Sequence, residues 1–556
     1  MADKFVYNFN EGNKDMRDLL GGKGANLAEM TNLDIPVPYG FTITTEACTR
    51  FYQENEALWE SLNEEVTSHI KDLEAANEKT FGSTEDPLLV SVRSGAPISM
   101  PGMMDTILNL GLNDQAVIGL AKKTDNERFA YDSYRRFIQM FADVAMELDK
   151  NNFEKLLSAK KEEKGVELDT ELDSNDLKEL VEEYKEKYKE LKGEEFPQEP
   201  REQLDLAISA VFRSWGNERA ILYRKINDID DAMGTAVNVQ TMVYGNMGDT
   251  SGTGVAFSRN PATGENKLFG EYLINAQGED VVAGVRTPQE IHTLKTAMPE
   301  VYEQFAATSK KLENHYQDMQ DMEFTIQEGK LFLLQTRNGK RTAQAAVQVA
   351  VDLVNEGLLD KKEAVLRVNP KDLDGLLHPT FTNKAKDTND AVATGLAASP
   401  GAAVGKISFS AKDAAKRATA GEQVILVREE TSPEDLEGMV SAQGILTARG
   451  GMTSHAAVVA RGMGKCCVSG ASEIHVDEDE GIVRIGDKTY TKEDTISIDG
   501  SSGKVYIGGL ETQSPQLEGN FGTFMGWVDE FRDMKIRTNA DTPRDVKQAL
   551  ESGAEG

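Results

Sequence analysis

The chain has 556 residues, of which 61 are Lys or Arg and 93 are Asp or Glu, so its formal net charge is −32. This length suits three or four domains, and the charge argues against nucleic acid or an anionic membrane as a general partner. No apolar run approaches the ~20 residues that span a bilayer, the N-terminus lacks a signal peptide's apolar core, and three cysteines fit neither a disulfide framework nor a metal site, so we expect a reduced, cytoplasmic, globular protein.

The first predicted unit, residues 1 to about 110, mixes short apolar runs with Gly-rich loops, as an α/β domain does. Gly21-Gly-Lys-Gly24 is a Gly-rich loop that opens a predicted helix, and Lys23 is placed to neutralise phosphate. The loop is not a P-loop, because the Gly-x4-Gly-Lys-Ser/Thr spacing is absent. By itself it is a weak signal, since many loops share this composition.

Two features further along this unit also point to a phosphate group. Arg93 lies near the end of a predicted strand that starts at Val90, although an arginine in a surface ion pair is the alternative. The loop from residue 99 to 106 contains Gly102 and Met104. Its backbone is flexible enough to cover a triphosphate.

A helical and heavily charged region is predicted from about 113 to 230, with the densest charge between residues 154 and 192. Charge runs of this kind are usually solvated helix faces. We therefore expect no chemistry from them.

Strands return between residues 234 and 340, and two pairs of polar residues stand out there. Asp321 and Glu323 are two residues apart and so share one face of a strand, as do Gln335 and Arg337 after an apolar run. On neighbouring strands they would place oxygen ligands that suit Mg2+ beside a cation for a transferring phosphoryl group. The alternative is an exposed strand face with alternating polar residues.

The chain beyond residue 340 divides into further predicted segments. The small, polar composition of residues 387–403 is typical of a linker. Apolar runs that alternate with helical segments then indicate a compact α/β domain. In chain order we expect a helical connector at 341–386, the linker at 387–403, the α/β domain at 404–508, a linker helix at 509–534, and a strand, turn and helix at 535–556.

The α/β domain contains the most informative stretch, Gly450-Gly-Met-Thr-Ser-His-Ala-Ala-Val-Val-Ala-Arg461. It places His455 between a Gly-rich turn and a helical run, with Thr453 and Ser454 as good N-cap types. A helix N-terminus favours a phosphoryl dianion, so the imidazole is suited to carry a phosphoryl group on a ring nitrogen. A buried histidine that hydrogen-bonds a backbone carbonyl is the alternative, and the flanking glycines argue against it.

This stretch resembles the phosphohistidine signature of the phosphoenolpyruvate-utilising enzymes, and the pyruvate, phosphate dikinase family in particular. Related families typically carry Arg where Met452 stands. The similarity covers essentially the whole chain. It implies a multidomain α/β and α+β protein, with an ATP-grasp nucleotide-binding domain at 1–340 that carries a helical insertion at about 113–230. It also implies a swivelling phosphohistidine domain, while residues 535–556 resemble the start of a TIM barrel that is otherwise largely absent, so we expect a truncated protein.

The resemblance also assigns roles to residues. Arg337 is implied as the catalytic arginine beside the phosphoryl-accepting His455, and Asp321 helps to complete the site. The implied Mg2+ ligands are Glu323 and Gln335. Further implied contacts to ATP or phosphate are Lys23, Arg93, Gly102, Met104, Thr253 and Gly254, with Arg135 for phosphate unless it is only a helix-surface arginine, and Glu271 and Glu279 for Mg2+ or the ribose unless they are structural.

The implied activity joins ATP, phosphate and pyruvate with AMP, pyrophosphate and phosphoenolpyruvate. We expect this chain to phosphorylate His455 from ATP and phosphate, with a swivel near 387–403 and 509–534, and to lack the pyruvate half-reaction. The alternatives are a water dikinase of the phosphoenolpyruvate synthase type and a non-catalytic phosphocarrier or regulator. In parts of the family a regulatory kinase modifies the threonine equivalent to Thr453, for which an N-cap role is the simpler interpretation.

Overall fold

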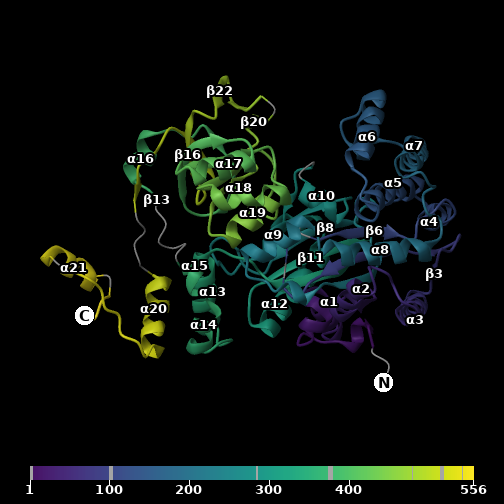
Figure 1. Cartoon of the computed structure of the whole chain (residues 1–556), viewed down its shortest axis with the longest axis horizontal. Coiled ribbons are helices and arrows are strands. Elements are labelled where there is room, and N and C mark those ends of the chain that lie inside the picture. The colour runs from purple at the N-terminus through teal and green to yellow at the C-terminus, as the bar shows by residue number, and fades with distance from the viewer. Residues whose placement is uncertain are drawn as a thin grey trace.

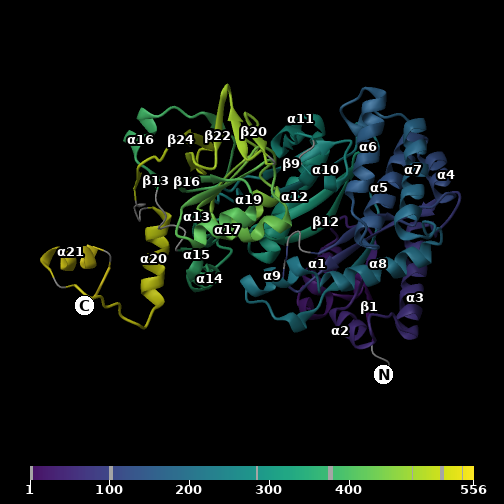
Figure 2. The ribbon, with the colours of Figure 1, turned by 45° about the horizontal axis from the view of Figure 1, so that its top comes forward.

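The computed structural model describes residues 4–98, 100, 104–283, 286–373, 380–478, 480–513, 519–540, 542–551 and 553–556. Its N-terminal half (4–340) and its His455 domain (380–513) lie side by side, and the C-terminal helix α21 (Pro543–Glu551) lies at the far end of the molecule (Figure 1). Figure 2 shows the same arrangement after the whole molecule is turned so that its top, where the His455 domain lies, comes forward. Within the described residues, no helix combines the length and the apolar character that a membrane crossing requires.

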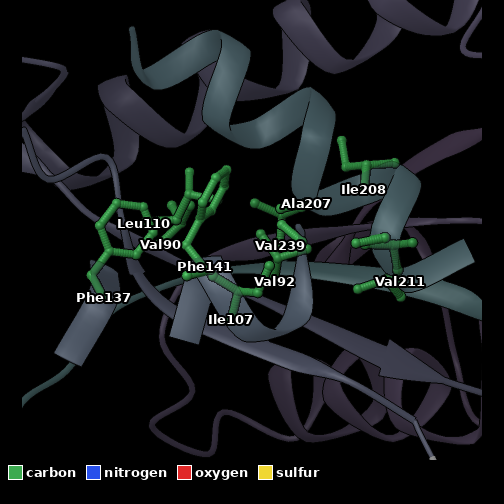
Figure 3. Close-up of a cluster of buried hydrophobic side chains, with 14 of the residues drawn as sticks. Val90, Val92, Ile107, Leu110, Phe137, Phe141, Ala207, Ile208, Val211 and Val239 are labelled. Atoms are coloured by element: carbon green, nitrogen blue, oxygen red, sulfur yellow. The ribbon is translucent and has the colours of Figure 1, made fainter. Parts of the chain in front are cut away.

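The first sheet of the N-terminal half separates apolar and polar side chains between its two faces. Val90 and Val92 point towards helices α5 (Glu127–Val144) and α8 (Pro200–Ser214), where Phe141 and Val211 pack on them (Figure 3). Because side chains alternate along a strand, Arg93 lies on the opposite face. The strand order is β1 (Val6–Asn8), β2 (Gly40–Ile43), β7 (Ala236–Thr241), β5 (Val90–Gly95) and β6 (Thr106–Leu110).

The second sheet is fully antiparallel and shows the same separation. Phe324 packs on Phe305 of α12 (Pro299–Tyr316), with ring centroids 4.4 Å apart, and Met322 and Tyr272 share this apolar face. The opposite face carries the polar residues of the predicted site. Its strand order is β10 (Gln289–Glu290), β9 (Phe269–Ile274), β8 (Gly252–Phe257), β11 (Gln320–Gln327) and β12 (Lys330–Asn338).

Helices surround the two sheets, and the region from 113 to 230 is helical as predicted. These helices are α4 (Ala116–Thr124), α5 (Glu127–Val144), α6 (Asn151–Lys164), α7 (Ser174–Lys192), α8 (Pro200–Ser214) and α9 (Glu218–Ile226). The others of this half are α1 (Arg17–Asn32), α2 (Thr45–Gln53), α3 (Glu60–Asn77), α10 (Gly278–Ala283), α11 (Leu294–Ala297) and α12 (Pro299–Tyr316).

The helical connector is formed by two segments that are far apart in the sequence. Helices α13 (Ala343–Asn355), α14 (Lys361–Arg367) and α15 (Pro370–Leu373) precede the His455 domain, and α20 (Asn520–Phe531) follows it. Phe524 and Trp527 of α20 are buried against α13 and α14. The second half of the predicted linker 509–534 is therefore a packed helix.

The His455 domain is built on a mixed eight-stranded sheet with α17 (Ala411–Thr419), α18 (Leu436–Ser441) and α19 (His455–Gly462). Strands cover the apolar runs at 424–428, 444–447 and 466–469, and a hairpin follows at 495–507. The strand order of the large sheet is β14 (Ala393–Thr394), β24 (Lys504–Ile507), β23 (Thr495–Asp499), β16 (Ala402–Ser408), β17 (Val424–Arg428), β18 (Gly444–Thr447), β19 (Cys466–Ser469) and β15 (Leu396–Ser399). A smaller sheet consists of β20 (Ile474–Asp477), β21 (Ile482–Ile485) and β22 (Lys488–Thr491).

The prediction of a linker at 387–403 is wrong for most of this segment. Strands β14 and β15 lie at the two edges of the large sheet, and β16 begins at Ala402. Its small side chains, such as those of Ala393 and Ala398, are buried, so a composition that resembles a linker serves close packing here. The domain begins with β13 (Thr380–Phe381), which pairs with β25 (Thr512–Gln513), and α16 (Asn383–Thr388). Residues 374–379 and 514–518, which join it to the connector, lie outside the described residues.

The strand predicted at 535–541 is also absent from the part of this segment that the structure describes. Residues 535–540 have no regular secondary structure, and Met534 and Ile536 are exposed. A strand requires a neighbour for its backbone hydrogen bonds, and no described strand lies beside these residues. The helix predicted after them is α21.

Candidate functional site

Helix α1 brings Lys23 between the two sheets of the N-terminal half. Gly21 interrupts the helix with a φ of 68°, and a Cβ there would lie 1.8 Å from the carbonyl oxygen of Gly95, so only glycine fits. The N–H of Gly22 donates to the carbonyl of Ala96, the residue after β5 of the first sheet, 2.8 Å away. On the other side, Asn26 Nδ2 donates to the carbonyl of Thr336 in the second sheet at 2.7 Å.

Arg93 also bridges the two sheets. Its Nη2 donates to Glu323 Oε2 at 2.5 Å, and its Nη1 donates to the carbonyl of Leu334 at 3.2 Å. Leu334 is the extra residue of a β-bulge, because Glu323 pairs with Gln335 whereas Phe324 pairs with Leu333. Bulges leave backbone groups without a ladder partner and are frequent beside active sites. Here the bulge supplies the carbonyl that holds Arg93.

The four polar residues predicted from strand spacing do share one face of the second sheet. Asp321 pairs with Arg337, and Glu323 pairs with Gln335 on the neighbouring strand. Arg337 Nε donates to Asp321 Oδ2 at 2.7 Å. The pairing of β11 with β12 therefore brings these residues together as expected.

Two buried acceptors on this face have no hydrogen-bond partner within the described residues, Asp321 Oδ1 and Gln335 Oε1. A buried oxygen without a partner is costly unless a ligand satisfies it. Carboxylate and amide oxygens are the ligand types that Mg2+ prefers. The orphaned oxygens of Asp321 and Gln335, with the Glu323 carboxylate on the same face, therefore fit an oxygen-coordinated cation such as Mg2+.

The charges on this face influence one another strongly. Burial and the neighbouring Arg93 lower the pKa of Lys23 to about 7, against the opposing effect of Glu323. Burial disfavours the ionised form of Glu323, but Arg93, Lys23 and Arg337 outweigh it and lower its pKa. Three basic side chains around one carboxylate form a cluster suited to a polyanion.

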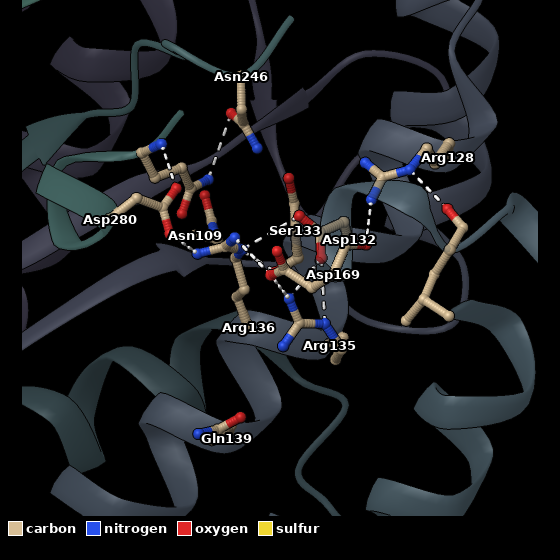
Figure 4. A network of polar contacts seen from close by, with 12 residues as sticks. Asn109, Arg128, Asp132, Ser133, Arg135, Arg136, Gln139, Asp169, Asn246 and Asp280 are labelled. Atoms are coloured by element: carbon tan, nitrogen blue, oxygen red, sulfur yellow. Dashed lines mark hydrogen bonds and ion pairs between the residues drawn. The ribbon is translucent and has the colours of Figure 1, made fainter. Parts of the chain in front are cut away.

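Arg135 lies elsewhere, in an ion-pair network between α5 and its neighbours (Figure 4). It is buried, and its Nε and Nη2 both donate to Asp132 Oδ1. Its Nη2 also contacts Asp169, while Arg136 links Asp132 to Asp280 of α10. These contacts support a structural role rather than the implied phosphate contact.

The other implied nucleotide contacts have mixed outcomes. Thr253 lies on the polar face, where its hydroxyl donates to the carbonyl of Phe324 at 3.1 Å. Gly254 lies on the apolar face, where a Cβ would meet the Phe324 ring at 2.6 Å, so its glycine serves packing. Met104 is half-buried against the hydrophobic core that covers the apolar face of the first sheet. Gly102 and the side chain of Glu279 lie outside the described residues.

His455 is the first residue of α19, after an N-cap formed by Ser454. The Ser454 hydroxyl accepts from the N–H of Ala457, so Ser454 and not Thr453 is the cap. Thr431 Oγ1 lies 3.2 Å from His455 Nδ1. His455 Nε2 is buried and has no hydrogen-bond partner among the described residues. Burial lowers the pKa of His455 and so favours the neutral imidazole. Asp435 and Glu434 act in the opposite direction but do not outweigh burial.

Arg461 of the same helix holds the loop before His455. It is buried, and its Nη1 donates to the carbonyl of Ala398 at 3.0 Å while its Nη2 donates to the carbonyl of Met452. Its guanidinium carbon lies 5.7 Å from the ring centre of Phe257, which belongs to the N-terminal half. Burial lowers the pKa of Arg461 to about 10.

Glu271 connects the two halves of the site. Its Oε1 accepts from the N–H of Met452 at 3.3 Å, and its Oε2 accepts from the Thr453 hydroxyl at 3.4 Å. Strand pairing places Glu271, Val255, Glu323 and Gln335 in one row across the polar face, which we call the polar row. The loop that carries His455 therefore rests on one end of this row, and the predicted magnesium ligands lie at the other end.

Sequence reasoning missed Thr431, Arg461 and the bulge at Leu334. Thr431 is 24 residues from His455, and no local pattern connects them. Arg461 lies inside the histidine motif, where a long cation after an Ala/Val run was a usable signal for a buried contact.

Comparisons with known proteins agree with this arrangement. A family described as "Pyruvate phosphate dikinase, AMP/ATP-binding domain" matches residues 17–81, 58–303 and 294–357, and one described as "PEP-utilising enzyme, mobile domain" matches residues 420–503. The chain is similar over its whole length to the pyruvate, phosphate dikinase of Clostridium symbiosum, at 62% identity over 554 residues and 63% of that protein. It is 55% identical over 559 residues to the chloroplastic enzyme of Mesembryanthemum crystallinum, covering 59% of it, and 56% identical over 546 residues to pyruvate, phosphate dikinase 2 of Oryza sativa subsp. japonica, covering 61%.

The chain spans about three fifths of the length of these relatives, from 59% to 63%. The matched families cover both the two-sheet N-terminal half and the His455 domain. The chain therefore belongs to the pyruvate, phosphate dikinase family.

Proposed function

We propose that this chain transfers the β-phosphoryl group of ATP to His455 while the γ-phosphoryl group passes to inorganic phosphate. The products are AMP, pyrophosphate and the phosphohistidine, so every phosphoryl group of the reactants is accounted for. The observation that carries the proposal is the polar row, since it runs from the loop before His455 to Glu323 and Gln335 on one face of one sheet. Interconversion of pyruvate and phosphoenolpyruvate is proposed only for the full-length enzyme.

The side chains present support specific tasks. Lys23, Arg93 and Arg337 would bind the phosphates and balance their charge. Glu323 and Gln335 would hold Mg2+, which when bound neutralises phosphate charge. The buried Nε2 of His455 keeps its lone pair if Nδ1–H donates to Thr431 Oγ1, and Nε2 is then the acceptor atom.

The carrier role requires movement, because one histidine reacts only within about 3 to 3.5 Å of each phosphoryl group. We place the swivel outside residues 380–513, because β13 and α16 pack on β24 through Phe381 and Tyr506 and so belong to the moving domain. A regulatory kinase acting on Thr453 fits this proposal. A phosphate there would repel the Glu271 carboxylate when the domain docks.

The test is labelling of the full chain with ATP that carries radioactive β-phosphate, with Mg2+, in the presence and absence of phosphate. We expect acid-labile, base-stable label that requires phosphate and is lost in His455→Asn. His292→Asn is the matched control, because the His292 side chain is 59% exposed. Label without added phosphate would indicate the water dikinase, and no label on the native chain would indicate a carrier that depends on another kinase.

A further inference from the structure

Thr431 contacts His455 from a loop of the same domain. Its Oγ1 lies 3.2 Å from His455 Nδ1. The loop runs from the end of β17 to the short 3-10 helix Pro433–Asp435, and residues 429–432 form neither helix nor strand. Loop backbone is mobile unless neighbouring groups restrain it. The contact with the imidazole therefore depends on whatever holds this loop.

An ion pair closes the loop at its two ends. Nη1 of Arg428, the last residue of β17, lies 3.3 Å from Asp435 Oδ1, and the two side chains are 20% and 6% exposed. The other carboxylate oxygen, Asp435 Oδ2, accepts from the N–H of Ser432 at 2.9 Å. A buried carboxylate needs such partners at both oxygens. Asp435 thus ties the start of the loop to the residue that follows Thr431.

Both ends of this connection are themselves fixed. Arg428 Nη1 donates to the carbonyl of Phe409, the residue after β16, at 3.2 Å, and its Nε lies 3.0 Å from Glu478 Oε1. Pro433 restricts the residue before it to an extended conformation, and Ser432 has a φ of −116° and a ψ of 169°. Thr431 therefore lies in a loop that is restrained on both sides.

We infer that Arg428 and Asp435 are positioning residues that close the loop between them, so that the Thr431 hydroxyl meets His455 Nδ1. This inference deepens the proposed function and rests on it. A hydroxyl held at Nδ1 selects the tautomer whose Nε2 keeps its lone pair for the phosphoryl group.

A purely electrostatic role for the pair is the alternative to test. Burial lowers the pKa of His455, and Asp435 acts to raise it. Removal of Arg428 would leave the Asp435 charge unbalanced, which also disfavours a neutral imidazole. Position and charge make different predictions once both members of the pair are removed.

The experiment compares Arg428→Ala with Arg417→Ala in the full chain. Arg417 is the matched control, because it donates to the carbonyl of Ile407 in β16 at 2.7 Å and pairs with Glu422 at 2.7 Å, before β17 rather than after it. Nitrogen chemical shifts of isotope-labelled histidine report the tautomer, with His455→Asn identifying the signal among six histidines. Label from ATP reports transfer.

For Arg428→Ala we expect a shift towards the tautomer with the proton on Nε2, and labelling slower by up to about fivefold, the factor for one neutral hydrogen bond. Arg428→Lys keeps a cation for Asp435 and should recover part of the rate. Arg417→Ala should match the native chain in both measurements. A native tautomer in Arg428→Ala, or the same shift in Arg417→Ala, would overturn the inference.

Two double variants separate position from charge. Arg428→Ala/Thr431→Val should be no slower than Thr431→Val alone, because both changes remove one contact and their effects are not additive. Arg428→Ala/Asp435→Ala removes both charges but leaves the loop open, so it should stay slow. A return to the native rate and tautomer in this variant would assign the effect to charge and overturn the inference. If the native chain takes no label, the proposed function fails, and the tautomer measured without nucleotide still decides whether the pair positions Thr431.

Discussion

The two regions that meet at Glu271 are organised by different forces. On the polar face of the second sheet, ion pairs hold the side chains, with Arg93 on Glu323 and Arg337 on Asp321. In the histidine loop, neutral groups do this, as Ser454 caps α19 and Ser469 donates to the carbonyl of Gly450 at 3.1 Å. The first region is held by ion pairs, and the second by hydrogen bonds of neutral groups together with those of Arg461.

This difference suits a domain that has to leave one site for another. Ionised groups are costly to remove from water unless they are paired, so a loop with a neutral imidazole and backbone donors is cheaper to bury at each docking site. Even Arg461, the buried cation of the loop, makes its hydrogen bonds to backbone carbonyls. The ion pairs around the predicted magnesium ligands lie in the N-terminal half, and Glu271 of that half contacts the loop.

Arg337→Ala should reduce the rate of His455 labelling more than the other changes, because it removes a positive charge from the ion-paired face of the second sheet. We expect labelling of His455 to slow by about a thousandfold, the range reported for arginines that stabilise phosphoryl transfer. Rapid-quench measurement of label formation tests this. Arg341→Ala is the matched control, since Arg341 follows the same strand but pairs with Asp318. Native labelling by the Arg337 variant would show that the ion-paired face does not act on phosphate.

The sequence was sufficient for the parts of the site that depend on local spacing. A separation of two residues places Asp321 with Glu323, and Gln335 with Arg337, on one face, and the pairing of β11 with β12 confirmed that both pairs meet. A helix start at His455 also follows from neighbouring residues, which offered Thr453 and Ser454 as caps, and the structure selects Ser454. The strands of the His455 domain were predictable from their apolar runs.

Features that depend on tertiary contacts were not predictable. The alanines between 393 and 403 have a linker's composition, yet partner strands bury them. Arg135 has the residue type of a phosphate ligand, but Asp132 and Asp169 occupy its guanidinium. Glu271 was expected to contact Mg2+ or the ribose unless it is structural, and its hydrogen bonds in the structure include one from Met452, 181 residues further along the chain. Each case was decided by a neighbour that is distant in sequence.

Lys23 gives a smaller effect that depends on pH. Its pKa of about 7, against an ordinary 10.5, means that the free protein releases this proton as pH rises through 7. A bound polyanion raises the pKa again, so ATP binding takes up a proton between these values, and affinity should fall above pH 7 by at most about tenfold per pH unit. Calorimetry in buffers of different ionisation enthalpy measures the uptake. Lys23→Arg stays charged and should remove both the uptake and the fall, and proton uptake that persists in this variant would assign it to another group.

The smallest expected effect lies at Thr431, where the neutral region is changed by one hydrogen bond. Thr431→Val removes the oxygen that lies 3.2 Å from His455 Nδ1 without changing the shape of the side chain. Without an acceptor for Nδ1–H, part of the molecules carry the proton on Nε2. Labelling should then slow by about fivefold, as expected for the loss of one neutral hydrogen bond. Thr431→Ser keeps the hydroxyl and should recover the native rate. Nitrogen chemical shifts of the imidazole in both variants report the tautomer directly. Slow labelling by the valine variant with an unchanged tautomer would mean that Thr431 orients the ring without selecting the nitrogen that accepts the phosphoryl group.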